Sequence, residues 1–224
     1  GRFGLADRLL YGLGWLLLYR PLRDKLGMRR VRTALSGAAP IAPEVLHWLW
    51  AIGVPVREGY GQTENTAMAT YTPADDVRIG TVGRPLEEVE LRIADDGEIL
   101  TRSPGVFAGY LKDPEATAAT IDPEGWLRTG DVGELDADGF LKITDRKKDI
   151  IITAGGKNIS PSEIENRLKV SPYIREAIVI GDRRKYLTAL IGIEADTVGD
   201  WATRRGIPYT TYADLASRPE VREL

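Results

Sequence analysis

The sequence predicts an α/β domain that carries a small β subdomain and is followed by a small, mobile α+β domain. Residues 31–57 read as strand, helix and strand, and a loop follows each strand. From about residue 79 to residue 146, short alternating stretches are separated by turn signals such as Asp96-Gly97 and Asp138-Gly139. The charged stretch 145–149 then runs into the apolar run 150–153. We therefore predict domains at residues 1–146, with the β subdomain at 79–146, and at 149–224, with a mobile charged joint at 147–148 between them.

The first domain supplies the two loops of greatest interest. A strand over Val31–Leu35 leads into the small-residue loop Ser36–Pro40, and a helix over Pro43–Trp50 leads to a strand over Val54–Arg57 and the loop Glu58–Glu64. In such an arrangement, ligands bind at the carboxyl ends of the strands. The β subdomain then has expected strands at 89–93, 98–101, 133–135 and 140–143.

The second domain begins with a clearly marked helix. Ser160 is placed as the N-cap, Pro161 as the first helical residue and Glu163 as the partner in a capping box. Strands over 177–180 and 187–193 follow, and a further helix begins near Asp196. On composition alone, the charged stretch before this domain can equally be a solvated run ahead of an ordinary strand.

Composition excludes several classes of function. Thirty Lys and Arg face 33 Asp and Glu, so the net charge of -3 gives no general field for binding nucleic acid. The absence of cysteine excludes disulfides, thiolate zinc sites and a cysteine nucleophile, and it fits a reducing, cytoplasmic setting. The sequence carries no signal for an oligomeric state.

The segment Leu9–Tyr19 is apolar but only about half as long as a bilayer requires. A buried or surface amphipathic helix is the main interpretation, and peripheral contact with the inner face of the membrane is the alternative. The alternative depends on the basic residues beside the segment, which are Arg20, Arg23, Lys25, Arg29, Arg30 and Arg32.

Two common nucleotide motifs do not fit. A P-loop needs a glycine where Ile151 stands and a hydroxyl residue where Asn158 stands, and the dinucleotide fingerprint needs a glycine at Leu17. Two other short motifs, at residues 60–64 and 128–131, each allow two interpretations. Tyr60, Thr63 and Glu64 can stack on a base, touch a phosphate and hold a divalent cation, or they can form a polar turn with a core tyrosine. Asp131 can accept hydrogen bonds from ribose hydroxyls or support a turn.

Taken together, these strings resemble the adenylate-forming, or AMP-binding, superfamily, and they are most similar to bacterial long-chain fatty acyl-CoA synthetases. The match rests on five motifs in a fixed order, at residues 36–40, 60–64, 97–110, 128–131 and 145–149. The glycine-containing segment 155–161, which follows the charged stretch, also matches. The resemblance implies a ligase that joins ATP and a fatty acid to give an acyl-adenylate and then transfers the acyl group to coenzyme A. It also implies that the chain holds the end of the large domain and part of the small mobile domain.

The resemblance further implies roles for individual residues. Gly37, Ala38 and Ala39 line the adenine pocket, and Tyr60 stacks on the base beside Gly61. Thr63 contacts the α-phosphate, Glu64 holds Mg²⁺, and Asp131 binds the ribose with help from Arg146. Lys148 is the hinge, and Gly155 and Gly156 border the pantetheine arm of coenzyme A. Thr63, Glu64, Arg146 and Lys148 form the catalytic group in this assignment.

Two parts of the family pattern are missing from the sequence. These are the upstream Ser/Thr/Gly-rich phosphate loop and the lysine near the end of the small domain. We therefore expect a fragment that is inactive, or nearly so, on its own. Two alternatives stay open, namely an adenylation domain that loads a carrier protein and a non-catalytic nucleotide-binding homologue.

Overall fold

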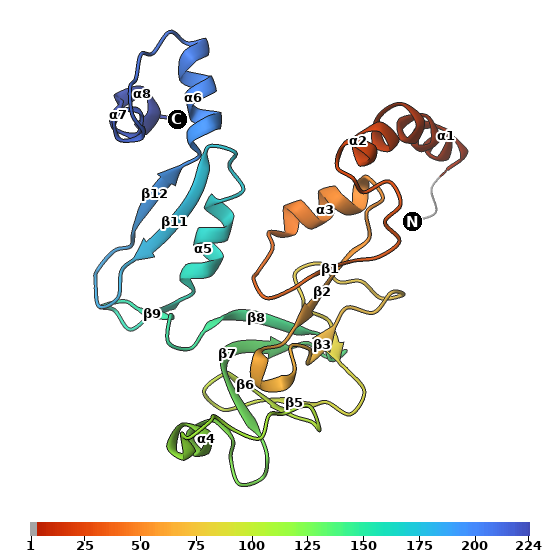
Figure 1. The fold of residues 1–224 in the computed structure, drawn as a ribbon, viewed down its shortest axis with the longest axis vertical. Helices are drawn as coiled ribbons and strands as arrows, with labels where there is room; N and C mark the ends of the chain where they lie inside the picture. Colours follow the sequence, from red (N-terminus) through yellow and green to blue (C-terminus); the bar gives the residue numbers. More distant parts are fainter. Residues whose placement is uncertain (1–3) are drawn as a thin grey trace. The chain divides into compact units, whose positions relative to one another are not determined.

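The computed structural model describes residues 4–224, which form two compact units. The first unit runs to Thr129 and includes Gly133–Ile143. The second unit combines Gly130–Val132 with Thr144–Leu224. Figure 1 shows the helices and sheets of both units in chain order. The predicted hinge at 147–148 is a statement about motion and stays a prediction.

The apolar N-terminal segment forms a helical stretch in the first unit. It consists of α1 (Leu5–Gly14), a π-helical turn η1 (Trp15–Tyr19) and α2 (Arg20–Lys25). Leucines of α1, among them Leu9 and Leu10, are exposed, whereas Arg23 is buried and donates to the carbonyl oxygens of Met28 and Val31. No helix within residues 4–224 combines the length and apolarity that a bilayer crossing requires.

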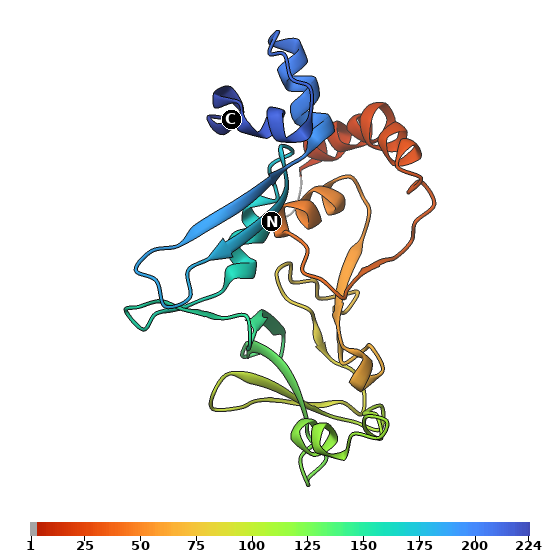
Figure 2. The ribbon, with the colours of Figure 1, turned by 60° about the vertical axis from the view of Figure 1, so that its left-hand side comes forward.

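A four-stranded sheet follows, with the order β1-β2-β3-β4. Strands β1 (Ala34–Ser36) and β2 (Val56–Tyr60) are parallel, and β3 (Thr70–Tyr71) and β4 (Arg84–Pro85) continue the sheet antiparallel. Helix α3 (Pro43–Ala51) connects the parallel pair and lies over it in both ribbon views (Figures 1 and 2). Leu46 of this helix packs with Val54 and Val56, so the apolar face of α3 fixes the two strands whose ends carry the predicted loops. Strand β2 extends to Tyr60, although we predicted that a loop begins at Glu58.

The β subdomain is the second four-stranded sheet, with the order β5-β6-β7-β8. Its strands are β5 (Glu90–Ile93), β6 (Glu98–Arg102), β7 (Leu127–Leu135) and β8 (Leu141–Arg146), and α4 (Pro114–Thr120) lies in the connection between β6 and β7. Strand β7 is much longer than the predicted 133–135, because its residues 127–131 alternate between buried and exposed or half-buried positions as in a half-buried strand. The 128–131 motif is therefore part of a strand and not a turn.

The second unit places a helix against an antiparallel pair. Helix α5 (Pro161–Leu168) packs on β11 (Ile174–Ile180), which pairs with β12 (Thr188–Ile193). A short hairpin of β9 (Ile151–Ile152) and β10 (Asn158–Ile159) precedes α5, and α6 (Ala195–Arg204), α7 (Tyr212–Ser217) and α8 (Pro219–Arg222) follow β12. In the apolar run 150–153 after the charged stretch, only Ile151 is buried, and Ile152 is half exposed.

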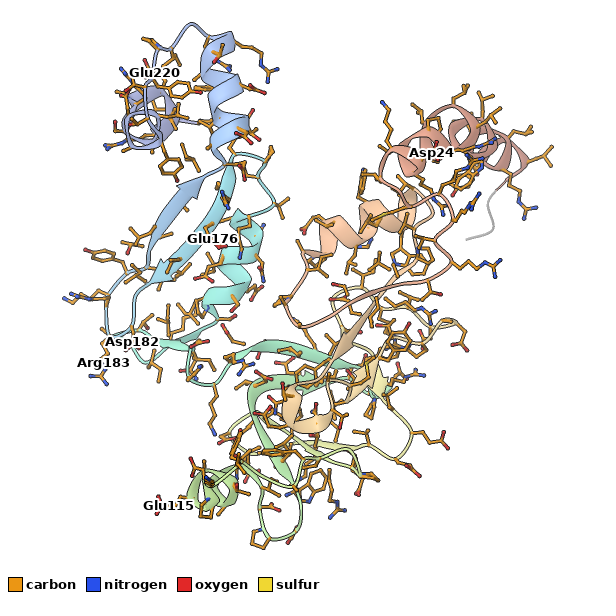
Figure 3. The ribbon with its side chains drawn as sticks, in the orientation of Figure 1. Asp24, Glu115, Glu176, Asp182, Arg183 and Glu220 are labelled. Atoms are coloured by element: carbon orange, nitrogen blue, oxygen red, sulfur yellow. The ribbon has the colours of Figure 1, made fainter. Side chains whose placement is uncertain are left out.

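The turn between β11 and β12 holds the short hairpin in place. Figure 3 labels Asp182 and Arg183 at this turn, beside β9. The backbone N–H of Ile152 donates to the Asp182 carboxylate at 3.1 Å, and the Arg183 N–H donates to the Ile152 carbonyl oxygen at 2.8 Å. These bonds supply partners for backbone N–H and C=O groups of β9, which is too short to pair all of them with a neighbouring strand.

Candidate functional site

The loop after β1 has an uncommon backbone. Ala38 has a φ of 67°, in the left-handed region that costs a residue with a Cβ about 1 kcal/mol or more. A Cβ at Gly37 would lie 3.1 Å from the carbonyl oxygen of Gly59, so glycine lets this loop run close to β2. Gly37, Ala38 and Ala39 are exposed. Their backbone is therefore accessible at the carboxyl end of a parallel strand, where a flat ligand can approach it.

The loop after β2 is tighter still. A Cβ at Gly61 would lie 2.3 Å from the carbonyl carbon of Ala67, so no other residue fits there. Thr66 and Ala67 both have a positive φ, and the Ala67 N–H donates to the Gln62 carbonyl oxygen at 2.8 Å. Backbone strain of this kind persists only where the surroundings hold it, and it is frequent at ligand sites. The loop presents η2 (Thr63–Asn65), with Thr63 exposed and Glu64 half-buried.

Tyr60 is placed differently from the other residues of this loop. It is 8% exposed and packs with Ala69, Ile99 and Leu141 in the core between the two sheets of the first unit. Most of the Tyr60 surface is therefore buried by packing, as in the interpretation of Tyr60 as the core tyrosine of a polar turn. The stacking of Tyr60 on a base stays a prediction.

The Glu64 carboxylate has a partner that the sequence analysis did not assign. The Tyr110 phenol donates to Oε1 of Glu64 at 2.8 Å, and the Phe107 N–H donates to the Glu64 carbonyl oxygen at 2.8 Å. The hydrogen bond to Glu64 raises the pKa of Tyr110, so the phenol stays protonated as the donor. Tyr110 belongs to the quoted 97–110 motif, but its contact with Glu64 spans 46 positions and leaves no local signal.

In the second unit, Asp131 and Arg146 lie side by side. Asp131, on β7, is buried, and Nε of Arg146, at the end of β8, lies 3.0 Å from its Oδ1. The pair adjoins an open pocket of about 340 Å³ lined by Gly130, Arg146, Lys147 and Lys148. A carboxylate can accept hydrogen bonds from hydroxyl groups, while the three cations that line the pocket can attract a phosphate. The structure therefore brings together Asp131, Arg146 and Lys148, which were predicted from two separate motifs.

A second set of contacts joins β8 to α5 across the predicted hinge. The Ser162 hydroxyl donates to the buried Asp145 carboxylate at 2.9 Å, and the Ser160 hydroxyl donates to the Thr144 carbonyl oxygen at 2.8 Å. Ser160 is also the N-cap, since its oxygen accepts the Glu163 N–H at 3.3 Å. We call these two side-chain bonds the β8–α5 clamp. The sequence indicated the cap but not the clamp.

Gly155 and Gly156 form the tip of the β9–β10 hairpin. Gly156 has a φ of 77°, and its N–H donates to the Thr153 carbonyl oxygen at 2.8 Å. Both glycines are exposed. The predicted site residues thus fall into two groups, one on the loops that follow β1 and β2 and one on β7, β8 and the segment after β8.

Comparison with known proteins identifies the family to which the chain belongs. The profile of the family described as AMP-binding enzyme matches residues 14–111, and that of the AMP-binding enzyme C-terminal domain matches residues 148–205. The chain belongs to the AMP-binding enzyme family. The resemblance that the five ordered motifs indicated is confirmed.

Individual AMP-binding enzymes cover nearly the whole chain. It is 41% identical to the long-chain-fatty-acid–CoA ligase FadD15 of Mycobacterium bovis over 97% of its length and 41% identical to the human long-chain-fatty-acid–CoA ligase 6 over 92%. It spans 36% and 31% of those two relatives.

Among solved structures, the o-succinylbenzoate CoA synthetase of Bacillus subtilis, bound to an acyl-adenylate intermediate, is 29% identical. It matches with a TM-score of 0.69 over 94% of this chain and 49% of its own. The predicted fold class, an α/β domain end followed by an α+β unit of an adenylate-forming enzyme, is confirmed.

Proposed function

We propose that the full-length protein containing this chain is a fatty acid–CoA ligase that forms AMP and acts on long-chain acids. The observation that carries the proposal is the 41% identity, over nearly the whole chain, to two relatives named long-chain-fatty-acid–CoA ligases. The loops after β1 and β2 and the Asp131–Arg146 pair have the chemistry that such a reaction requires. In the reaction, a carboxylate oxygen of the acid attacks the α-phosphorus of ATP and pyrophosphate leaves. The thiolate of coenzyme A then attacks the acyl carbon and AMP leaves.

The first unit supplies the groups for the base and the phosphates. In this proposal the exposed backbone at Gly37, Ala38 and Ala39 receives the adenine, with Tyr60 and Gly61 forming the wall beside it. Thr63 is exposed at the start of η2, so its hydroxyl can donate to an oxygen of the α-phosphate, where negative charge builds up during attack. Each hydrogen bond to a charged group contributes about 1.5 to 3 kcal/mol.

Glu64 fits the magnesium ion that the family implies. Magnesium is bound through one or two carboxylates together with phosphate oxygens and water, so a single carboxylate beside the phosphate site suffices as the protein's share. Within residues 4–224, no cluster of three His, Cys, Asp or Glu is arranged to hold a metal. When bound, the ion neutralises charge on the phosphates.

The second unit supplies the groups for the ribose and for coenzyme A. Asp131 offers two acceptor oxygens to the ribose hydroxyls, and Arg146 both holds Asp131 and places a positive charge beside the phosphate. The Gly155–Gly156 tip is where a thin pantetheine arm can pass close to the backbone. The segment at Lys148 is the pivot about which the small domain changes position between the two half-reactions.

The experiment measures acid-dependent exchange of pyrophosphate into ATP and the formation of acyl-CoA by the full-length protein. The panel contains long-chain, short-chain and aromatic acids. We expect both activities with long-chain acids and a loss of at least about tenfold in kcat/KM for ATP in Asp131→Asn, because one charged hydrogen-bond acceptor is removed. Preference for short or aromatic acids would reject the long-chain assignment. Exchange with no transfer to coenzyme A would favour loading of a carrier protein.

A further inference from the structure

Tyr110 holds the carboxylate on which the proposed metal site depends. The two residues come from different elements, since Glu64 lies in η2 and Tyr110 in the connection between β6 and α4. The phenol donates to Oε1 of Glu64 at 2.8 Å. Within residues 4–224, Oε2 of Glu64 has no hydrogen-bond partner, so one oxygen of the carboxylate is held and the other is available.

The connection that carries Tyr110 is fastened to the η2 turn at further points. The Phe107 N–H donates to the carbonyl oxygen of Glu64 at 2.8 Å, and the Thr66 hydroxyl donates to the carbonyl oxygen of Gly105. The rings of Phe107 and Tyr110 meet edge to face, with centroids 4.8 Å apart. Contacts of two rings in this geometry are favourable by about 0.5 to 1.5 kcal/mol beyond the area they bury.

Tyr110 is also fixed from the side of α4. Its N–H donates to the Thr117 hydroxyl at 2.9 Å. Gly109 allows this approach, because its φ is 136° and a Cβ there would lie 2.6 Å from a carbon of Thr117. The Tyr110 ring is therefore held by a backbone contact and a ring contact in addition to its bond to Glu64.

We propose that Tyr110 is a positioning residue that aims the Glu64 carboxylate at the divalent cation of the nucleotide. This inference rests on the proposed role of Glu64 as the magnesium ligand. The terminal torsion of a glutamate side chain is broad, so a free carboxylate samples many orientations. Magnesium requires nearly ideal octahedral geometry, and groups that orient a ligand typically change metal affinity about 10- to 100-fold.

The test measures the binding of ATP to the full-length protein by calorimetry at a series of magnesium concentrations. We expect Tyr110→Phe to raise the magnesium concentration at half-maximal ATP binding by about tenfold, since the ring contact with Phe107 is kept while the orienting bond is lost. The affinity for AMP without metal stays within about twofold of the parent protein, because the same substitution leaves the base and ribose contacts in place. Thr120→Val is the matched control: it removes a hydroxyl that influences the phenol and leaves the bond to Glu64 in place, so we expect an unchanged magnesium midpoint.

Glu64→Gln separates the two possible failures. If Glu64→Gln shifts the magnesium midpoint and Tyr110→Phe does not, Glu64 keeps its proposed role and the positioning by Tyr110 is rejected. If Tyr110→Phe weakens AMP and ATP binding equally, its role is structural and the inference is also rejected. If Glu64→Gln leaves the midpoint unchanged, the proposed metal role fails and the inference falls with it. In the Glu64→Gln background, we expect Tyr110→Phe to have no further effect on the midpoint.

Discussion

At the scale of single residues, Glu58 gives the protein a pH dependence that the sequence does not show. It lies in the middle of β2, and burial raises its pKa from 4.5 to about 7, against a lowering effect of a hydrogen bond from the Gly80 backbone. Between these two pH values, the folded state holds a proton that the unfolded state has released. The free energy of unfolding therefore decreases as the pH rises from about 4.5 to about 7.

We expect Glu58→Gln to remove this part of the pH dependence, because glutamine does not titrate. Urea unfolding at intervals between pH 4.5 and pH 8 measures it, with the exposed Glu87→Gln as the control that keeps the profile of the parent protein. A profile of Glu58→Gln that runs parallel to that of the parent protein would show that Glu58 is not the group responsible.

Residue types were more predictable than residue contacts. The motif at residues 60–64 identified Thr63 and Glu64 as candidates, and the structure places both on η2 and not in an irregular loop. The bond between Tyr110 and Glu64 joins positions 46 apart, so no local pattern could indicate it. The burial of Tyr60 likewise depends on Ile99 and Leu141, which come from two other strands.

At the scale of elements, the β8–α5 clamp ties the start of a helix to the end of a strand. Asp145 is buried, so its carboxylate needs donors, and Ser162 supplies both a hydroxyl at 2.9 Å and a backbone N–H at 3.4 Å.

We expect Ser162→Ala to lower the free energy of unfolding by about 1 to 3 kcal/mol, since a buried charged acceptor loses a partner. Chemical denaturation measures it. Ser217→Ala, at an exposed position of α7, is the control and changes stability by less than about 0.5 kcal/mol. An equal effect of the two substitutions would contradict the importance of the clamp.

Element boundaries were predictable where a capping residue marks them. Ser160 and Pro161 placed the start of α5 correctly, because the N-cap bond is local. The extent of β2 and β7 was wrong, because Gly59 and Gly130 look like turn residues. Gly59 instead pairs with Tyr71 of β3, and Gly130 lies within β7 although its φ is 70°. The motifs at residues 60–64 and 128–131 therefore lie partly within strands.

At the scale of the whole molecule, the order of the motifs was enough to identify the family. It says nothing about whether the small domain moves relative to the large one. The clamp bears on that movement. Thr144 and Asp145 precede the predicted pivot, and Ser160 and Ser162 follow it, so a rotation about residues 147–148 opens both bonds of the clamp. We therefore predict a second arrangement of the small domain in which both bonds of the clamp are open.

Lys148→Pro tests the pivot directly. Proline fixes φ at residue 148 and restricts the backbone of Lys147, so the segment can keep one arrangement but cannot exchange it for another. Because the proposed two-step reaction needs both predicted arrangements, we expect one half-reaction of the full-length protein to fall by at least about tenfold while the other changes by less than about twofold. The two steps are followed separately, as pyrophosphate exchange and as single-turnover transfer from the acyl-adenylate to coenzyme A. Lys148→Ala, which leaves the backbone free, serves as the control for the loss of the side chain. An equal loss of both half-reactions in Lys148→Pro, or of neither, would place the pivot elsewhere in the chain.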